Sequence, residues 1–128
     1  MEKKIIEHNH TFAGLKSGGL ANDRSIRATQ MPNGKIFVVY CSVLNNKQAH
    51  IFEYKSKENK LSHRYSSDNH SFLNGAVCST TNEIYLSGSR LGRTKSCSNV
   101  SITRDGIKIR NLPEMIYGRY DHSMTLLN

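Results

Sequence analysis

Tryptophan is absent from this chain of 128 residues, only two prolines occur, and aromatic residues make up 8% of the sequence. The supply of large apolar side chains for a core is therefore small. No stretch approaches the roughly 18 consecutive apolar residues that a membrane-spanning helix needs. The first eight residues carry charge but lack the apolar stretch of a secretory signal peptide. We expect a soluble, cytoplasmic protein.

Cysteine is also scarce, and its spacing excludes two classes of small protein. Cys41, Cys78 and Cys97 form no CxxC pair, and an odd number leaves one thiol unmatched in any disulfide scheme. Neither a zinc ribbon nor a secreted disulfide framework is indicated, so a reducing compartment fits best. Cys41 and Cys78 lie in or beside apolar stretches, which is typical of small core residues rather than nucleophiles.

Acidic residues number only ten, and most of them fall in expected turns. No pair of carboxylates suited to acid–base catalysis can be identified. Six histidines include His8 and His10, whose spacing would place both side chains on one face of a strand. No third ligand follows from the sequence, so a metal site is disfavoured. We expect no enzymatic activity, no cofactor and no metal.

The formal net charge of +8 raises the question of nucleic acid or an acidic protein as partner. Lysine and arginine are spread through expected turns, and acids are interleaved with them between Glu53 and Glu58. Aromatic residues do not alternate with the cations, as a stacking platform for bases would require. We therefore do not expect a nucleic-acid-binding protein.

What the chain does contain is apolar residues in runs of four to eight, which favour β-strands over helices. Two such runs, at residues 35–42 and 83–89, begin alike and end in small residues. A constant offset of 48 relates Ala28 to Ala76, Ile36 to Ile84, Phe37 to Tyr85, Val38 to Leu86, Phe52 to Val100, Tyr54 to Ile102 and Leu61 to Ile109. One repeat therefore organises the sequence.

Each repeat is predicted to contain four strands. In the first they fall at residues 26–31, 35–42, 49–55 and 60–66, and in the second at residues 75–79, 83–89, 99–103 and 107–112. The strand at residues 35–42 is apolar on both sides and needs cover on both faces. The fourth strand of the first unit is mostly polar, as an edge strand should be. Residues 1–20 are predicted to be the trailing strands of a preceding unit.

The junction after the second unit resembles a known family. Asn111-Leu112-Pro113-Glu114-Met115, followed by Arg119-Tyr120-Asp121-His122-Ser123, resembles the junction between consecutive kelch repeats. Ile84-Tyr85-Leu86-Ser87-Gly88 resembles the second kelch strand, which normally ends in a Gly-Gly pair. Only Gly88 of that pair is present, and Leu61 and Ile109 lie near the position of the usual tryptophan.

The resemblance implies an all-β fold of β-propeller blades, each a four-stranded antiparallel meander. Residues 24–71 and 72–119 would be two complete kelch-like blades, flanked by partial blades at residues 1–20 and 120–128. Because propellers need about four to eight blades, we expect a fragment or truncated relative of a longer protein. Such an array would oligomerise or need further blades, since its terminal sheets expose apolar faces.

A competing resemblance concerns residues 101–109, which are faintly similar to the Asp-box turn of sialidase-type propellers. The aromatic residue that the Asp box requires is missing. An Asp-Gly hairpin turn at Asp105 and Gly106 explains the same residues without any functional content. The hairpin is the favoured interpretation.

Connections alternate between the two ends of a four-stranded meander. The loop between the second and third strands therefore emerges at the same end as the connection between blades, the face that kelch-like propellers use for partners. The candidate partner-binding residues at this end are Asn45, Asn46, Lys47, Asp68, His70, Arg90, Arg93, Lys95, Arg119 and Tyr120.

These residues support the hypothesis of a non-catalytic protein-interaction module, a scaffold or substrate-adaptor segment. Arg90, Arg93 and Lys95 have no acid among them, which suits an acidic or phosphorylated partner segment. The same loop could equally be a solvated connection. A further alternative is a lectin-like propeller that short chains assemble to bind glycans, although 128 residues are not a whole number of 48-residue units.

Overall fold

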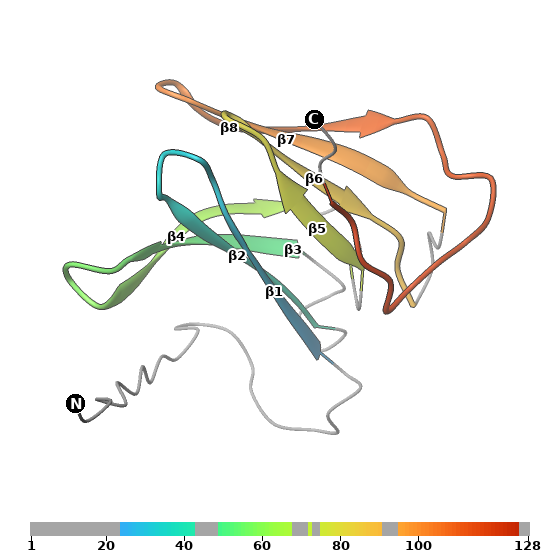
Figure 1. Cartoon of the computed structure of the whole chain (residues 1–128), viewed down its shortest axis with the longest axis horizontal. Helices are drawn as coiled ribbons and strands as arrows, with labels where there is room; N and C mark the ends of the chain where they lie inside the picture. Colours follow the sequence, from blue (N-terminus) through green and yellow to red (C-terminus); the bar gives the residue numbers. More distant parts are fainter. Residues whose placement is uncertain (1–23, 43–48, 68–71, 73–74, 91–94, 126–128) are drawn as a thin grey trace, which may run out of the picture.

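The computed structural model describes residues 24–42, 49–67, 72, 75–90 and 95–125, and the regular structure in these residues is entirely β (Figure 1). Eight strands form two four-stranded antiparallel sheets, each in sequence order, and neither sheet closes on itself. The all-β prediction is confirmed. None of the described residues belongs to a helix that could cross a membrane.

The first sheet contains β1 (Arg24–Gln30), β2 (Ile36–Ser42), β3 (Ala49–Lys55) and β4 (Lys60–Ser67). The second sheet contains β5 (Ala76–Ser79), β6 (Glu83–Ser87), β7 (Cys97–Thr103) and β8 (Gly106–Leu112). The polar β4 lies at an edge of its sheet, as predicted. The predicted trailing strands at residues 1–20 lie outside the described residues, and residues 120–125 belong to neither sheet.

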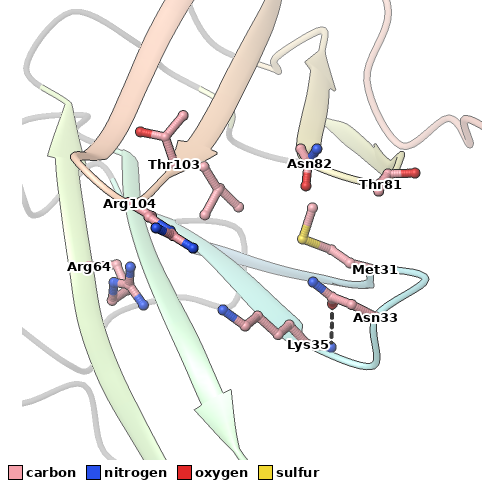
Figure 2. Close-up of a pocket in the computed structure, with 9 residues that line it drawn as sticks. Met31, Asn33, Lys35, Arg64, Thr81, Asn82, Thr103 and Arg104 are labelled. Atoms are coloured by element: carbon pink, nitrogen blue, oxygen red, sulfur yellow. Dashed lines mark hydrogen bonds between the residues drawn. The ribbon is translucent and has the colours of Figure 1, made fainter.

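The turn between β1 and β2 has the chemistry that its sequence predicts. Pro32 supplies a fixed φ, and Gly34 adopts a φ of 89°, which favours glycine. The Gly34 amide donates to the Met31 carbonyl over 2.8 Å, and the Lys35 amide donates to Asn33 Oδ1 over 2.9 Å (Figure 2). These bonds fix the hairpin and direct β2 back along β1.

The central hairpin of the second sheet differs from the predicted boundaries. β6 ends at Ser87 rather than residue 89, because Gly88 takes a φ of 75° and leaves the strand. The Gly88 amide then donates to the Ser96 carbonyl over 2.8 Å. β7 accordingly begins at Cys97, two residues earlier than predicted.

The main core lies between the two sheets. Its nine side chains are no more than 3% exposed: Met31, Phe37, Val39, Ala49, Ile51, Phe72, Ile84, Leu86 and Val100. Full burial of a large apolar side chain contributes about 1.5–3 kcal/mol. Half-buried Tyr65, Val77, Ile102, Ile107 and Ile109 pack around this cluster. The apolar runs found in the sequence therefore serve mainly to join one sheet to the other.

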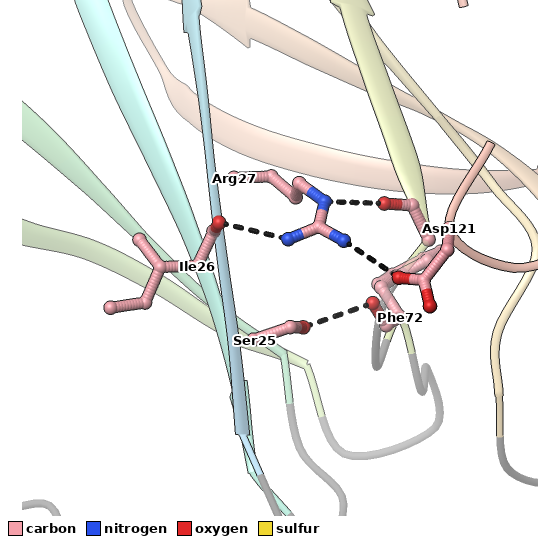
Figure 3. Close-up of polar contacts among 6 residues, drawn as sticks. Ser25, Ile26, Arg27, Phe72 and Asp121 are labelled. Carbon is pink, nitrogen blue, oxygen red and sulfur yellow. Dashed lines mark hydrogen bonds and ion pairs between the residues drawn. The ribbon is translucent and has the colours of Figure 1, made fainter. Parts of the chain in front are cut away.

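The two sheets stack in the same sense, with β1 beside β5 and β4 beside β8. Side-chain hydrogen bonds run from Ser25 to the Phe72 carbonyl, from Arg27 to the Gly75 carbonyl and from Thr29 to Ser79. In these three contacts the residue number increases on both sides in the same order, so β1 and β5 run parallel to each other (Figure 1). Figure 3 shows the first two of the contacts. The residue separations of 47, 48 and 50 follow the sequence repeat closely.

The faces that meet are opposite faces of the repeated unit. Phe37 and Val39 of β2 point into the core, so Ile36 and Val38 point away from the second sheet. In β6 the core residues are Ile84 and Leu86, which the 48-residue offset relates to Ile36 and Val38. A two-fold symmetric sandwich would bury equivalent faces, so the two sheets are not related in that way and instead stack in the same orientation.

The two outward faces differ in character. On the first sheet, Tyr40 of β2 and Phe52 of β3 are 3% and 4% exposed, whereas Ile36 and Val38 on the same face of β2 are half-buried, so the predicted cover on this side of β2 is only partial in the described residues. On the second sheet the outward face is polar: the Tyr85 hydroxyl donates to Glu83 Oε2 over 2.7 Å, and the Ser101 hydroxyl donates to Asn99 Oδ1 over 3.2 Å. The hydrogen bond to Glu83 is the main cause of a raised pKa for Tyr85.

Candidate functional site

Residues 113–125 form a connection that returns from the end of β8 across the second sheet toward β5 (Figure 1). The Met115 amide donates to the Lys95 carbonyl over 2.8 Å, and the Ser89 amide donates to the Arg119 carbonyl over 3.0 Å. Ser87 Oγ lies 2.8 Å from His122 Nε2. The connection is therefore fixed to the end of the sheet where β6 stops and β7 begins.

Arg27 fastens this connection to both sheets. Its Nε donates to the Gly75 carbonyl over 3.0 Å, and its Nη2 lies 3.3 Å from Asp121 Oδ1 (Figure 3). The side chains of Arg27 and Asp121 are 35% and 56% exposed, so their ion pair contributes little stability by itself. The ion pair instead helps to position the connection, because one guanidinium contacts the start of β5 and Asp121 of the connection from β1.

Gly88 makes the close approach of the connection possible. A Cβ atom at this position would lie 2.2 Å from the Arg119 carbonyl oxygen and 2.6 Å from His122 Cε1. A carbonyl oxygen of the backbone cannot move away as the end of a flexible side chain can. The kelch-like glycine identified in the sequence is thus the residue against which the connection packs.

Large apolar side chains are exposed on this connection. Ile116 is 83% exposed, Tyr117 is 70% exposed and Tyr120 is 53% exposed, and the cations Lys95 and Arg119 are exposed beside them. We call these five residues the connection surface. An apolar hollow of about 560 Å³ adjoins it, lined in part by Met115, Ile116, Tyr117 and Met124. Exposed aromatic and apolar groups mixed with cations are typical of interaction sites.

No family model, curated protein or solved structure matches the chain. The kelch resemblance therefore rests only on the sequence residues quoted for it above.

The structure brings together four of the residues predicted from sequence. The hydrogen bonds of Ser89 and Met115 place Arg90, Lys95, Arg119 and Tyr120 at one end of the second sheet. Arg90 is half-buried, and the other three are exposed. The remaining candidates, Asn45, Asn46, Lys47, Asp68, His70 and Arg93, lie outside the described residues.

Ile116 and Tyr117 were not among the predicted site residues. The signal available in the sequence was an apolar pair directly after Pro113-Glu114-Met115, outside any alternating pattern. A strand pattern predicts which side chains turn inward, but no such period applies to a connection. Ile116 and Tyr117 remain exposed because of the path that the backbone takes between two attachment points, the hydrogen bond from Met115 to Lys95 and the one from Ser89 to Arg119.

Two serines, Ser66 and Ser87, lie in hydrogen-bond contact with histidines, which invites a comparison with nucleophilic catalysis. Ser66 Oγ lies 2.9 Å from His50 Nδ1 and 2.8 Å from His63 Nε2, and Ser87 Oγ lies 2.8 Å from His122 Nε2. His50 Nε2 and His122 Nδ1 are buried without a hydrogen-bond partner among the described residues. A catalytic triad needs a third group that orients the imidazole through that second nitrogen. None of the three histidines has this third group in the described part of the chain.

Metal ligation has no better support within the residues that the structure describes. They contain no group of three His, Cys, Asp or Glu side chains that could hold an ion. Cys41, Cys78 and Cys97 form no disulfide bond with one another. Burial raises the pKa of both Cys78 and Cys97, which disfavours the reactive thiolate form.

The imidazoles of buried His50 and half-buried His122 lead us to expect a pH dependence of stability. Burial lowers the pKa of His50, helped by His63, and burial lowers the pKa of His122, helped by Arg119 and Arg27. Below the ordinary pKa of about 6.5, the unfolded chain therefore binds protons that the folded chain does not. The stability that the neutral imidazoles contribute is fully present above that pKa. It is lost as the pH falls toward the lowered pKa values of the folded state. We expect the urea midpoint to decrease between pH 7.5 and pH 5.5.

The variant His50→Asn/His122→Asn provides the control for this pH dependence. Its urea midpoint at pH 7.5 can differ from that of the wild type, but the decrease on acidification should be smaller. An identical decrease in both proteins would show that other groups are responsible.

A second cavity, also of about 560 Å³, lies at the opposite end of the sheets, among the tight hairpin turns. Sequence reasoning assigned no role to this end. The residues that line the cavity come from both sheets: Met31, Asn33, Lys35, Arg64, Thr81, Asn82, Ile102, Thr103 and Arg104 (Figure 2).

Proposed function

We propose that this chain is a segment of a kelch-like β-propeller and works as a non-catalytic protein-interaction module. The parallel stacking of β1 on β5, with opposite faces of the repeated unit in contact, is the arrangement that successive blades require. The kelch-like junction sequence lies in the connection that packs against Gly88. Both observations support blades, and neither depends on the other.

The observation that carries the functional proposal is the connection surface. Ile116, Tyr117 and Tyr120 expose apolar area that a folded chain would otherwise bury. Tyrosine is favoured at the centre of interfaces, because it buries a large ring and still offers a hydroxyl group. The surface sits on a connection fastened by several hydrogen bonds, so it is held in place before a partner arrives.

The partner that suits this surface is an acidic protein segment with apolar anchors. Lys95 and Arg119 lie beside the exposed rings, and the chain as a whole carries a net charge of +8. Cations at the rim of an interface mainly speed association and select partners of opposite charge. The apolar side chains would supply most of the affinity.

A peptide-display experiment tests the proposal, because it samples many candidate segments at once and needs no named partner. The immobilised protein should select peptides that combine Asp or Glu with apolar residues. The variant Ile116→Ser/Tyr117→Ser should bind the selected peptides more than about tenfold more weakly, since central apolar anchors contribute at least 2 kcal/mol. The matched control Ile26→Ser changes another exposed apolar residue, 49% exposed on the outward face of the first sheet, and should bind normally.

Two results would overturn the proposal. In the first, no peptide is enriched by the wild type. In the second, the Ile116→Ser/Tyr117→Ser variant remains folded by circular dichroism and binds the selected peptides as tightly as the wild type does.

A further inference from the structure

The cavity at the hairpin end is a second site, at the far end of the strands from the connection surface. Its wall combines the β1–β2 turn and β4 of the first sheet with two turns of the second sheet, those that follow β5 and β7. A volume of about 560 Å³ is in the range of small-molecule sites. Because the cavity lies between the sheets, a ligand there would touch both repeated units.

The charged groups that line this cavity are all cationic. Lys35, Arg64 and Arg104 contribute to its wall, and no Asp or Glu among the described residues does so. Figure 2 shows the end groups of these three side chains directed into the same part of the cavity. Like charges gathered this way repel one another, and a bound anion removes that repulsion.

Arg64 is held in place by an ion pair outside the cavity lining. Its Nη1 pairs with Glu53 Oε1, and the Glu53 side chain is only 11% exposed. A guanidinium has five N–H donors, so this contact orients Arg64 and leaves other donors for a ligand. The arrangement fixes one cation of the site in advance.

Neutral donors complete the wall. Asn33 Oδ1 accepts a hydrogen bond from the Lys35 backbone amide, and this contact turns the side-chain nitrogen of Asn33 toward the cavity (Figure 2). Asn82 is held through its backbone, since its carbonyl accepts the Ile102 amide over 3.1 Å. Thr81 and Thr103 also line the cavity, but the Thr103 hydroxyl donates to the Gly106 carbonyl over 3.2 Å. Amide donors next to fixed cations are groups that recognise phosphate oxygens.

We propose that this cavity binds a small, non-aromatic organic polyphosphate. Arg64 is already paired with Glu53, so Lys35 and Arg104 supply the unbalanced positive charge, which favours an anion with more than one charge. The dimensions of the cavity admit a compact molecule rather than a folded partner. No aromatic side chain lines the cavity in the described residues, so nothing there can stack on a nucleotide base. Such a ligand would join the two sheets and stabilise their stacking.

Isothermal titration calorimetry at physiological ionic strength tests the proposal with inositol hexakisphosphate as the probe. We expect inositol hexakisphosphate to bind the wild type and to raise its melting temperature. The variant Lys35→Gln/Arg104→Gln should bind at least tenfold more weakly, because each lost contact is a charged hydrogen bond. The control Lys57→Gln/Lys108→Gln removes the same charge from exposed positions outside the cavity and should change the affinity less than threefold.

Equal weakening in both double variants would show non-specific attraction to the basic chain, and absence of binding to the wild type would overturn the site. Amide chemical-shift changes on the wild type provide a check that does not depend on variant folding. They should centre on Lys35, Asn82 and Arg104. Changes centred on Arg119 instead would also overturn the proposal.

Discussion

Replacing Gly88 with alanine should lower the free energy of unfolding by about 3 kcal/mol. Two causes combine at this position. The φ of 75° lies in the left-handed region, where a side chain adds strain, and the new Cβ would lie 2.2 Å from the Arg119 carbonyl oxygen. Because that oxygen belongs to the backbone, the connection has to move away from the sheet, which breaks the hydrogen bond from Ser89.

Gly34→Ala separates the two causes. Gly34 also has a positive φ, of 89°, but an added Cβ would meet nothing within 4 Å. The alanine there should cost only the conformational strain, about 1 kcal/mol. Urea denaturation of both variants measures the difference. Equal losses at Gly88 and Gly34 would show that the connection does not pack against Gly88 in solution.

Turn chemistry and periodicity made the strands predictable. Pro32-Asn33-Gly34 and Arg104-Asp105-Gly106 carry local signals that do not depend on the rest of the fold, and both form hairpin turns. The apolar run of β2 indicated burial on both faces. Val39 on the core side and Tyr40 on the outward side are each 3% exposed, but Ile36 and Val38 on the outward side are half-buried. Stacked sheets follow from that demand, because only another layer can cover a sheet with two apolar faces.

The register of the second sheet was not predictable from the repeat. Ile36 pairs with Tyr54, and the offset of 48 would therefore pair Ile84 with Ile102. In the structure, Ile84 pairs with Val100 instead, two residues away. The left-handed Gly88 and its bond to Ser96 set this register. A strand pattern with period two is unchanged by a shift of two residues, so it contains no information on that choice.

The two candidate sites also differ in whether the sequence could predict them. Meander topology was sufficient to place the Arg90 loop and Arg119 at one end of the sheets. The cavity at the other end could not be predicted, since Lys35, Arg64 and Arg104 come from three hairpins, and the first and last of these residues are 69 positions apart in the sequence. Lys35 and Arg64 belong to the first sheet, and only the stacking of the second sheet on it brings Arg104 beside them.

A disulfide between β1 and β5 should form readily and stabilise the protein strongly. The hydroxyl oxygens of Thr29 and Ser79 are 2.9 Å apart, so sulfur atoms at these positions need to approach by only about 0.9 Å to bond. The bond would close a loop across 50 positions of sequence. Chain-entropy arguments give about 4 kcal/mol of stabilisation for a loop of this length.

The same pair of positions tests the same-sense stacking of the two units most directly. In a Cys78→Ser background, Thr29→Cys/Ser79→Cys should form the disulfide under mild oxidation, as read by peptide mapping, while Ser25→Cys/Ser79→Cys should not. Four residues along a strand separate Ser25 from Thr29 by about 13 Å, which is too far for a disulfide. An antiparallel arrangement of β1 and β5 would reverse this preference, and a disulfide in the Ser25 pair but not in the Thr29 pair would contradict the same-sense stacking of the two sheets.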